Sequence, residues 1–396
     1  MRRIAESLLF FFLFPLLIPA QEPSDLPAIA DSAVAKALRT LRRTVTEIGD
    51  TNRFPSYGTK DLRWKLVRPS DWVSGFWPGT LWYAYELSGD RQFRTWAEQW
   101  TSSLENEKTD PRTHDLGFKF FCSYGNGLRL MKNDPLVPQY RTILLTAAST
   151  LDKRFVPTVG MFSSNWDKKP LPHSVPAIVD IMMNLELLFW SGENGGDPTV
   201  RERCISHALT TYRDFVRLDG STFHIVRYDS ATGSVLNKGQ IQGDVDSSTW
   251  SRGHAWTVYG MVMTYRFTND PRFLAYAQKT ADYFLAHLPK DGVARWDFQS
   301  PIDIRDASAS AIVCSALFEL QGYVKDAKER DRYRRSAEGI LRSLCLPPYF
   351  SRGEGTNALL LHSTQYFHAT ENTDVPSTFA DYYFLEALLR YRTLHR

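Results

Sequence analysis

The feature that most constrains the fold is a regular alternation between two kinds of helical segment. Residues 33–48 (AVAKALRTLRRTVTEI) carry Lys, Arg and Glu on one face, whereas residues 307–324 (ASASAIVCSALFELQGYV) are apolar almost all round. A helix with one charged face lies at the protein surface, while a helix that is apolar on all sides is buried. The alternation therefore predicts pairs in which one helix is exposed and the next is buried.

About twelve such segments follow one another along the chain, and the odd-numbered ones carry the charged face. In order, they cover residues 30–49, 72–88, 92–106, 115–131, 137–153, 175–192, 199–218, 248–267, 271–287, 306–323, 328–345 and 377–393. Six pairs of this kind predict an all-α fold, a closed (α/α)6 barrel of six helical hairpins whose inner helices line a cavity. A helical-repeat solenoid is the alternative, but the segments share no residue signature at a constant period.

One stretch departs from the helical pattern. Residues 221–229 (STFHIVRYD) alternate between apolar and polar side chains, and residues 230–233 (SATG) are typical of a turn. Residues 234–243 then lead back. We therefore expect a small β-hairpin inserted over the active-site mouth of the barrel, flanked by His224 and Gln242.

The first 20 residues have the character of an export signal. Two arginines precede an apolar run at residues 8–20, which ends in a small residue before Gln21. This pattern is typical of a cleaved secretory signal peptide. Because position 21 is not Cys, a lipoprotein anchor is not expected. We expect residues 21–396 to form a single catalytic domain that is periplasmic, with secretion as the alternative.

Charge, cysteines and motifs narrow the classes of function. The net charge of +3 favours neither nucleic acid nor a membrane surface as a partner. The four cysteines form no C-x-x-C pair, so we expect buried free thiols and no metal site. Residues 244–248 (DVDSS) offer only two carboxylates, which is few for a cation site. The sequence contains no serine-hydrolase, zinc-protease or nucleotide-binding motif.

Asp180 is the first candidate for catalysis because it lies in a run, residues 176–190, that is otherwise almost entirely apolar. We read this run as a buried helix. Burial raises the pKa of a carboxyl group unless it is paired, and a protonated carboxyl group can act as a general acid. Asn184 follows one helical turn later and is placed to hydrogen-bond this carboxyl. A core aspartate tied to a helix end or an arginine is the alternative.

Asp115 is the second candidate. It opens the fourth predicted helix behind Thr113, a plausible N-cap, and the helix dipole should keep it ionised. Two carboxylates whose surroundings separate their pKa values can act as an acid and its electrostatic partner. A capping role alone is the alternative for Asp115.

Further polar and aromatic residues begin the buried helices and should therefore gather at one mouth of the barrel. They are Asp71, Trp72, His114, Asp115, Asp180, Trp250, Arg252 and Asp306. Arg252 and Trp256 share a helix face with Trp250 near it, so a guanidinium can clamp a carboxylate while an indole stacks on a sugar ring. Core packing explains the tryptophans nearly as well, and His114 and His224 can equally be structural histidines.

Seven segments occur in the order found in one enzyme family. They are DWVSGFWPGTLWYAYE, THDLGFKFFCSYGNG, IVDIMMNLELLFW, RLDGSTFHIVRYDSATG, residues 242–256, RDASASAI and ADYYFLEALLR. In these segments the chain resembles glycoside hydrolase family 88, the unsaturated glucuronyl hydrolases, from about Asp71 to its end. The resemblance implies an (α/α)6 barrel that needs no metal or cofactor.

The resemblance also implies an unusual reaction. Polysaccharide lyases leave a C4=C5 unsaturated uronate at the non-reducing end of their products, and this family removes it by hydrating the vinyl ether. By similarity, Asp180 is the general acid and base, and Asp115 is the second essential carboxylate. His224 and Gln242 match residues that hold the uronate, and a further group matches its aromatic and basic pocket: Trp250, Arg252 and Trp256.

The source of the substrate stays open. His254 stands where many relatives have Gln, and residues 361–376 lack a Gly-rich turn associated with recognition of the next sugar. Fragments of chondroitin, heparin, hyaluronan, ulvan, gellan or xanthan are all possible substrates. An unsaturated rhamnogalacturonyl hydrolase acting on pectin fragments and a non-catalytic oligosaccharide-binding protein are the alternative functions. The sequence does not indicate an oligomeric state.

Overall fold

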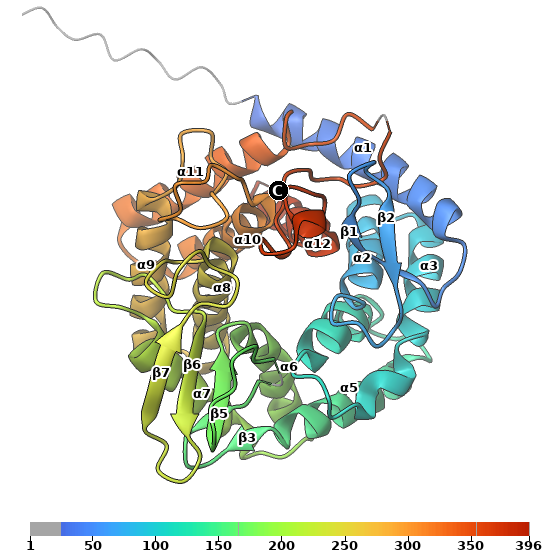
Figure 1. Cartoon of the computed structure of the whole chain (residues 1–396). Helices are drawn as coiled ribbons and strands as arrows, with labels where there is room; N and C mark the ends of the chain where they lie inside the picture. The colour runs from blue at the N-terminus through green and yellow to red at the C-terminus, as the bar shows by residue number, and fades with distance from the viewer. Residues whose placement is uncertain (1–24, 165, 354, 396) are drawn as a thin grey trace, which may run out of the picture.

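The computed structural model describes residues 25–164, 166–353 and 355–395, so the predicted signal peptide, residues 1–20, lies outside the described residues. Its helices wind into two concentric rings (Figure 1). The outer helices are α1 (Leu26–Ile48), α3 (Arg91–Ser102), α5 (Val137–Asp152), α7 (Val200–Phe215), α9 (Pro271–Ala286) and α11 (Ala327–Leu344). The inner ones are α2 (Phe76–Ser88), η2 (Gly117–Gly125) continued by α4 (Asn126–Leu130), α6 (Ile181–Glu193), α8 (Ser251–Thr268), α10 (Ala307–Tyr323) and α12 (Thr378–Leu394).

The inner ring is closed. Each inner helix packs against the next one along the chain, and α12 returns to pack against α2. The inner helices are buried on nearly every side, whereas the outer helices α1, α3 and α11 bury one face only. The predicted (α/α)6 barrel is therefore confirmed, and all twelve predicted helical segments are present.

The fourth predicted segment adopts an unusual form. Residues Gly117–Gly125 form a π-helix before the chain continues as α4. This helix lies very close to α6, because a Cβ atom at Gly117 would meet the Cα of Asn184 at 2.5 Å. A glycine is thus needed where the two inner helices approach, next to the carboxylates described below.

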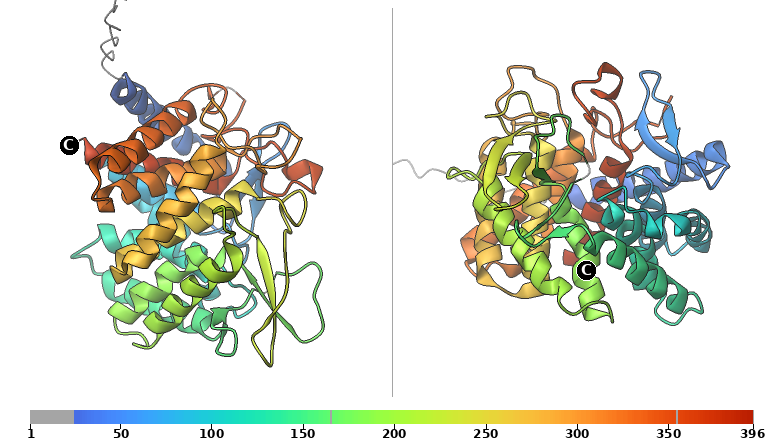
Figure 2. Two further views of the ribbon diagram at one scale, coloured as in Figure 1. Left: turned by 90° about the vertical axis from the view of Figure 1, so that its left-hand side faces the viewer. Right: turned by 60° about the horizontal axis from the view of Figure 1, so that its bottom comes forward.

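Short strands lie at one end of the barrel. The pairs are β1 (Phe54–Gly58) with β2 (Trp64–Val67) and β3 (Phe155–Val156) with β4 (Met161–Phe162), and a three-stranded antiparallel sheet contains β5 (Ser174–Ile178), β6 (Ile225–Asp229) and β7 (Val235–Gly239). Figure 2 shows the β1-β2 hairpin and this sheet extending from the same end of the barrel. Two 3₁₀ turns, η1 (Glu105–Thr109) and η3 (Thr370–Asn372), complete the elements.

The predicted hairpin is confirmed as β6 and β7, but the sequence prediction missed its third strand. Residues 174–178 pair with β6, with Ser174 opposite Asp229, and α6 begins only at Ile181. The prediction of a helix over residues 175–192 was therefore wrong at its start. An apolar run as short as this one fits a strand as well as a helix, and the hairpin supplies backbone partners that a local pattern does not reveal.

The core accommodates the cysteines as predicted. All four are buried and none forms a disulfide among the described residues: Cys122, Cys204, Cys314 and Cys345. In the described part of the chain, no helix combines the length and apolar character needed to cross a membrane.

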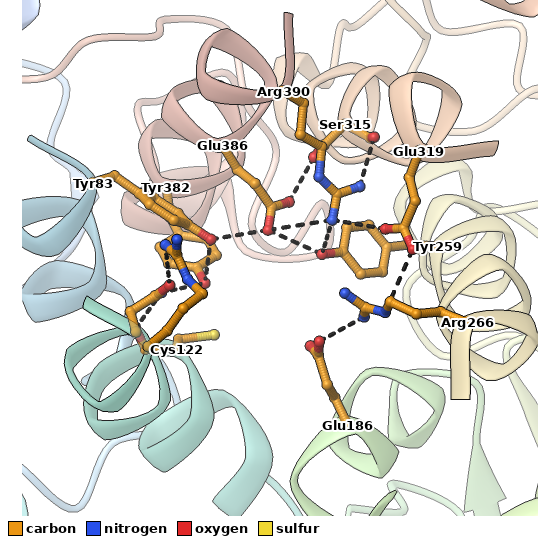
Figure 3. A network of polar contacts seen from close by, with 12 residues as sticks. Tyr83, Cys122, Glu186, Tyr259, Arg266, Ser315, Glu319, Tyr382, Glu386 and Arg390 are labelled. Carbon is orange, nitrogen blue, oxygen red and sulfur yellow. Dashed lines mark hydrogen bonds and ion pairs between the residues drawn. The ribbon is translucent and has the colours of Figure 1, made fainter. Parts of the chain in front are cut away.

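The inner helices carry a continuous network of polar contacts, which we call the polar ring (Figure 3). Its members are Tyr83 and Glu86 on α2, Asn126 and Arg129 on α4, Glu186 on α6, Tyr259 and Arg266 on α8, Ser315 and Glu319 on α10, and Tyr382, Glu386 and Arg390 on α12. The ring borders a cavity of about 750 Å³. It joins all six inner segments at the end of the barrel away from the strands.

A buried carboxylate secures the segment that precedes α12. Asp381 accepts hydrogen bonds from the backbone N–H groups of Leu359 at 3.0 Å and Leu360 at 2.9 Å. Burial raises the pKa of Asp381 to about 7, although these two donors act in the opposite direction. In the folded protein this carboxyl group therefore keeps its proton at a higher pH than in the unfolded chain, where its pKa is about 3.9.

We predict that Asp381 makes the protein less stable as the pH rises from about 4 to 7, since the folded state binds the extra proton in this window. The Asp381→Asn variant cannot titrate and should lack this contribution. The measurement is the melting temperature of both proteins from pH 4.5 to 8. The wild-type melting temperature should fall relative to that of the variant until about pH 7 and then run parallel to it. Parallel curves over the whole range would contradict the prediction.

Candidate active site

A cavity of about 590 Å³ opens among the N-terminal ends of the inner helices and the loops before them. Its inner wall is formed by Trp72, His114, Asp115, Ile178, Asp180 and Gln242. Its outer wall is formed by Ser70, Asp110, Arg112, Thr113, Trp166, Lys168, Gln365, Tyr366 and Asn372. The structure therefore brings the two predicted catalytic carboxylates to one cavity at the predicted mouth.

Asp180 lies between β5 and α6, and its partner comes from the hairpin. Oδ2 of Asp180 lies 3.3 Å from Nε2 of His224. Nδ1 of His224 accepts from the backbone N–H groups of Ile241 and Gln242, each at 3.3 Å. Because Nδ1 is the acceptor, the imidazole proton lies on Nε2, the nitrogen nearest the carboxylate. The hairpin thus holds His224 in the tautomer that can donate to Asp180.

Asp115 faces the same cavity from the residues just before η2. Its Oδ1 lies 3.5 Å from Nε2 of His114 and accepts from Nδ2 of Asn184 at 3.4 Å. The same Nδ2 lies 3.5 Å from the backbone oxygen of Asp180. The prediction that Asn184 binds the carboxyl group of Asp180 was therefore wrong. Its amide instead joins the Asp115 carboxylate to the backbone of the other candidate.

The two carboxyl groups differ in pKa, but in the sense opposite to the sequence prediction. Burial raises the pKa of Asp115, although His114 opposes the rise. Burial also acts to raise the pKa of Asp180, but the adjacent imidazole of His224, 3.3 Å away, holds it below its usual value together with His114 and Arg252. In the protein without substrate, Asp180 is thus the more acidic group. The sequence showed the apolar helix but not the partners that the hairpin and α8 bring.

Arg252 is enclosed behind the cavity wall, with only 1 % of its side chain exposed. Its Nη1 donates to Asp306 at 2.6 Å and to the backbone oxygen of Thr364. Its Nη2 donates to Oε1 of Gln242 at 3.1 Å and to the backbone oxygen of Gln365 at 2.7 Å. Arg252 therefore fixes Gln242, which lines the cavity. A direct contact between Arg252 and a substrate carboxylate stays a prediction.

The other predicted site residues fall into two groups. Trp72 and His114 line the cavity. Trp250 does not: it is 1 % exposed and packs behind His224, with the two ring centroids 4.6 Å apart. Trp256 is also 1 % exposed and packs on Phe118 of η2 and Tyr383 of α12. The sequence analysis placed these two tryptophans near the site, as the structure does. It did not distinguish residues that line the cavity from residues that pack behind its wall.

The sequence analysis missed most of the outer wall. Trp166 and Lys168 come from the loop between β4 and β5, and Gln365, Tyr366 and Asn372 come from the loop before α12. These loops show no helical or strand period. The available signal was an aromatic residue in each loop among polar residues, which is a frequent sign of a binding surface.

The acidic stretch at residues 244–248 has a structural explanation. Oδ2 of Asp297 accepts from the backbone N–H of Asp244 at 3.1 Å and from the hydroxyl of Ser248 at 2.6 Å. Oδ1 of Asp246 accepts from the backbone N–H of Gln240 at 3.0 Å. Among the described residues, no group of three or more His, Cys, Asp or Glu side chains is arranged to hold a metal ion.

Comparison with known proteins agrees with this architecture. The sequence model of Glycosyl Hydrolase Family 88 matches residues 45–346. An unsaturated glucuronyl hydrolase from Formosa agariphila is 42 % identical over 335 residues, which are 83 % of this chain and 82 % of the relative. An unsaturated glucuronyl hydrolase from Bacillus sp. strain GL1 is 34 % identical over 369 residues, or 90 % of this chain and 95 % of the relative.

Solved structures show the same similarity. The crystal structure of an unsaturated glucuronyl hydrolase specific for heparin superimposes with a TM-score of 0.88 at 35 % identity. The match covers 94 % of this chain and 98 % of that chain. The similarity therefore extends over nearly the whole length of both chains.

Proposed function

The chain belongs to glycoside hydrolase family 88, and from this premise we propose that it is an unsaturated glucuronyl hydrolase. Its substrate is an oligosaccharide released by a polysaccharide lyase, with a 4,5-unsaturated uronic acid at the non-reducing end. The observation that supports this most directly is the pair Asp180 and Asp115, which share one cavity and are joined through the amide of Asn184.

In the proposed reaction, the vinyl ether of the uronate is hydrated. Asp180 donates a proton to C4, and a water molecule adds at C5. The water oxygen forms the new bond to C5 and keeps one proton as a hydroxyl group, while the other proton passes to the Asp180 carboxylate. The hemiketal formed at C5 then opens, and the rest of the sugar is released from C1. The same group thus acts first as a general acid and then as a general base.

The resting pKa of Asp180 bears on how it acquires its proton. His224 and Arg252 keep this pKa low in the free protein. The bound substrate brings its own carboxylate into the same cavity, and a second negative charge nearby raises the pKa of a carboxyl group. We infer that substrate binding itself favours protonation of Asp180, so the acid form is produced only where it is needed.

The remaining wall residues suit a sugar acid. Trp72 offers an aromatic face, and Gln242 is held by Arg252 with its carbonyl oxygen, so its amide nitrogen is oriented away from the guanidinium. An amide N–H can donate to the uronate carboxylate or to a hydroxyl. His224 supports Asp180 from behind and is buried, so we assign it a positioning role in the proposed reaction.

The same proposal includes export. A signal peptide at residues 1–20 would carry the enzyme to the periplasm, or alternatively out of the cell, where lyase products of extracellular polysaccharides arrive. N-terminal sequencing of the mature protein from the periplasmic and culture fractions tests this, with a start at Gln21 as the expected result.

The test of the activity follows the ultraviolet absorbance of the C4=C5 uronate during incubation with lyase-made disaccharides. The panel contains products from chondroitin, heparin, hyaluronan, ulvan, gellan and pectin. Loss of absorbance with release of a free sugar supports the proposal, and activity confined to the pectin products would instead indicate an unsaturated rhamnogalacturonyl hydrolase. Binding of these compounds without any loss of absorbance would contradict a catalytic function and indicate an oligosaccharide-binding protein.

A prediction for Asn184 follows from its bond to Asp115. The amide is one of the groups that lower the pKa of Asp115, and its Oδ1 is occupied by the backbone N–H of Phe118 at 3.0 Å. In the Asn184→Leu variant the pKa of Asp115 should rise further, because burial then acts against one lowering contact fewer, while His114 and Lys119 remain. We expect kcat/KM at neutral pH to fall roughly ten-fold, the equivalent of about one lost hydrogen bond to a charged group. The part of the kcat/KM pH profile that depends on the titration of Asp115 should move to higher pH.

Asn126→Leu is the matched control for this prediction. Asn126 is also a buried inner-helix asparagine, but its amide donates to Tyr382 and to the backbone oxygen of Cys122 in the polar ring. We expect Asn126→Leu to lower the stability of the protein without changing the pH profile of kcat/KM. If Asn184→Leu also keeps the wild-type pH profile, Asn184 has only a structural role.

A further inference from the structure

One lysine is buried inside the barrel wall and lines neither of the two cavities described above. Lys119 lies on η2, and its side chain is 0 % exposed. Its backbone N–H donates to the backbone oxygen of Asp115 at 3.0 Å, so the two residues are neighbours in the same inner segment. A lysine is almost never fully buried unless its charge is paired. The groups around the ammonium therefore show what this lysine does.

The side chain of Lys119 joins two segments that build the wall of the catalytic cavity. Its Nζ donates to Oε2 of Glu107 in η1 at 3.0 Å and to the backbone oxygen of Ser70 at 3.4 Å. Ser70 lines the cavity, and so does Asp110, the residue at which η1 ends. The start of α2 also lies against this lysine, because a Cβ atom at Gly75 would meet the backbone oxygen of Lys119 at 2.4 Å. The ammonium group is thus held in one place.

The charge of Lys119 acts on carboxyl groups beyond its direct partner. It acts to lower the pKa values of Asp115, Asp71 and Asp110, which come from three different segments. Because the ammonium group is buried, salt and water screen its charge less than they would at the surface. One enclosed cation therefore influences the carboxyl groups at the base of the catalytic cavity.

Asp115 is the carboxyl group for which this charge has the clearest consequence. Burial and the negative charge of Asp180 raise its pKa, while three neighbours lower it: His114, Asn184 and Lys119. The amide of Asn184 carries no net charge, and an imidazole is charged only when it is protonated. A lysine ordinarily stays protonated at pH values where an imidazole is neutral. Two further charged groups interact with Asp115, namely Asp71 before α2 and Arg154 after α5.

We propose that Lys119 is a positioning residue of the reaction, which keeps Asp115 ionised and fastens the segments of Ser70 and Glu107 to the cavity wall. This inference rests on the proposed function, in which Asp115 is the second essential carboxylate. Protonation of C4 leaves a positive charge shared by C5 and the ring oxygen of the uronate. An ionised carboxylate in the cavity stabilises this charge, whereas a protonated one does not. Lys119 acts on the reaction through Asp115 and does not touch the substrate.

The experiment follows the titration of Asp115 by NMR of the aspartate carboxyl carbons, with Asp115→Asn to assign the signal. Lys119→Met has a side chain of similar length without the charge, so the midpoint should move to higher pH by about one pH unit. Glu107→Gln leaves the lysine charged and removes the carboxylate that balances it, so the midpoint should move to lower pH. Both variants weaken the same contact, and a purely structural contact would not produce shifts of opposite sign.

A double variant separates the charge from the stability of the fold. Lys119→Met alone leaves the carboxylate of Glu107 without its cation, which is costly at a site that is only 19 % exposed. Combining Lys119→Met with Glu107→Gln removes both charges and leaves neither group unpaired. The midpoint of Asp115 should still lie above the wild-type value, because the charge of Lys119 is among the effects that lower it. This variant keeps the inference testable if Lys119→Met does not fold.

Lys108→Met is the matched control. Lys108 also pairs with a glutamate of η1, Glu105, at 3.1 Å, but its side chain is 25 % exposed and does not line the cavity. The titration of Asp115 should be unchanged in this variant. Its kcat/KM should stay within about two-fold of the wild-type value, as for an exposed ion pair.

The rate of the reaction should follow the titration. In Lys119→Met, kcat/KM should be about ten-fold lower than in the wild type at pH values below the midpoint of Asp115, since one pH unit is a factor of ten in the ionised fraction. Above the midpoint of the variant, kcat/KM should approach the wild-type value. A distorted cavity wall would instead lower the rate at every pH.

Two results would overturn the inference. The midpoint of Asp115 could be the same in the wild type, Lys119→Met and the double variant, or it could move in the same direction in Lys119→Met and Glu107→Gln. Either result would leave Lys119 with a structural role alone. The titration does not depend on turnover, so a wild type that hydrates no unsaturated disaccharide contradicts the proposed function and leaves this test of Lys119 intact.

Discussion

Asp180→Asn is expected to lower kcat on lyase-made disaccharides by about 10³-fold, the contribution of a well-placed general acid and base. Asparagine has nearly the same shape as aspartate, so the cavity should keep its form. Its amide has no acidic proton to donate to C4 and is too weak a base to accept one from water. The absorbance of the C4=C5 uronate measures the loss, and quenching of tryptophan fluorescence measures binding, because Trp72 and Trp166 line the cavity.

Asp110→Asn is the matched control for this variant. Asp110 also lines the cavity, but it belongs to the outer wall and its carboxylate is occupied by Arg112. We expect its loss of kcat to stay below about ten-fold, as for an exposed ion pair. The mechanism would be contradicted if Asp180→Asn bound substrate and retained more than about a tenth of the wild-type kcat.

The architecture could be predicted from the sequence because its cause is local. A helix such as α10 is apolar on all sides, and its neighbour α11 carries charge on one face, so each helix shows by itself whether it is buried. The alternation of exposed and buried helices along the chain then excludes most other arrangements of the helices. Strand β5 escaped prediction because its hydrogen-bond partners come from β6, about fifty residues further on.

The site could be predicted only in part for the same reason. Asp115 and Asp180 stand out by type and position, and both lie in the cavity. Their pKa values depend instead on which groups the fold brings near them, and His224 reaches Asp180 only because the hairpin packs on β5. A sequence pattern reports burial, which raises a carboxyl pKa, but it does not report the donor that reverses this effect.

The polar ring places ionised side chains on inner helices that are otherwise apolar. The stability of the fold should therefore depend strongly on these contacts. Arg390 lies at its centre and is largely buried, with 19 % of its side chain exposed. Its guanidinium contacts Glu319 at 2.9 Å and Glu386 at 3.7 Å, and it donates to the hydroxyl of Tyr259 at 3.0 Å. Figure 3 shows these contacts converging on Arg390.

Arg390→Met is expected to destabilise the protein by roughly 3–5 kcal/mol, because removal of one partner leaves buried charges uncompensated. Glu319 and Glu386 would then face each other without the cation between them. Arg392→Met, two residues further along α12, is the control, since its exposed pair with Asp31 should contribute less than about 1 kcal/mol. The measurement is the denaturant midpoint of the wild type and both variants at pH 8 and at pH 5.5.

The pH dependence identifies the cause of this loss. In the wild type the charge of Arg390 helps to hold the pKa of Glu319 below its usual value against the opposing effect of burial. Without Arg390 this pKa should rise, so protonation of Glu319 should relieve part of the destabilisation at pH 5.5. A cavity left by a shortened side chain would instead cost the same at both pH values. Because the cavity bordered by the ring shares no lining residue with the catalytic cavity, kcat below the melting temperature should stay within about two-fold of the wild-type value. Equal stability losses for Arg390→Met and Arg392→Met would show that the ring does not hold the barrel together.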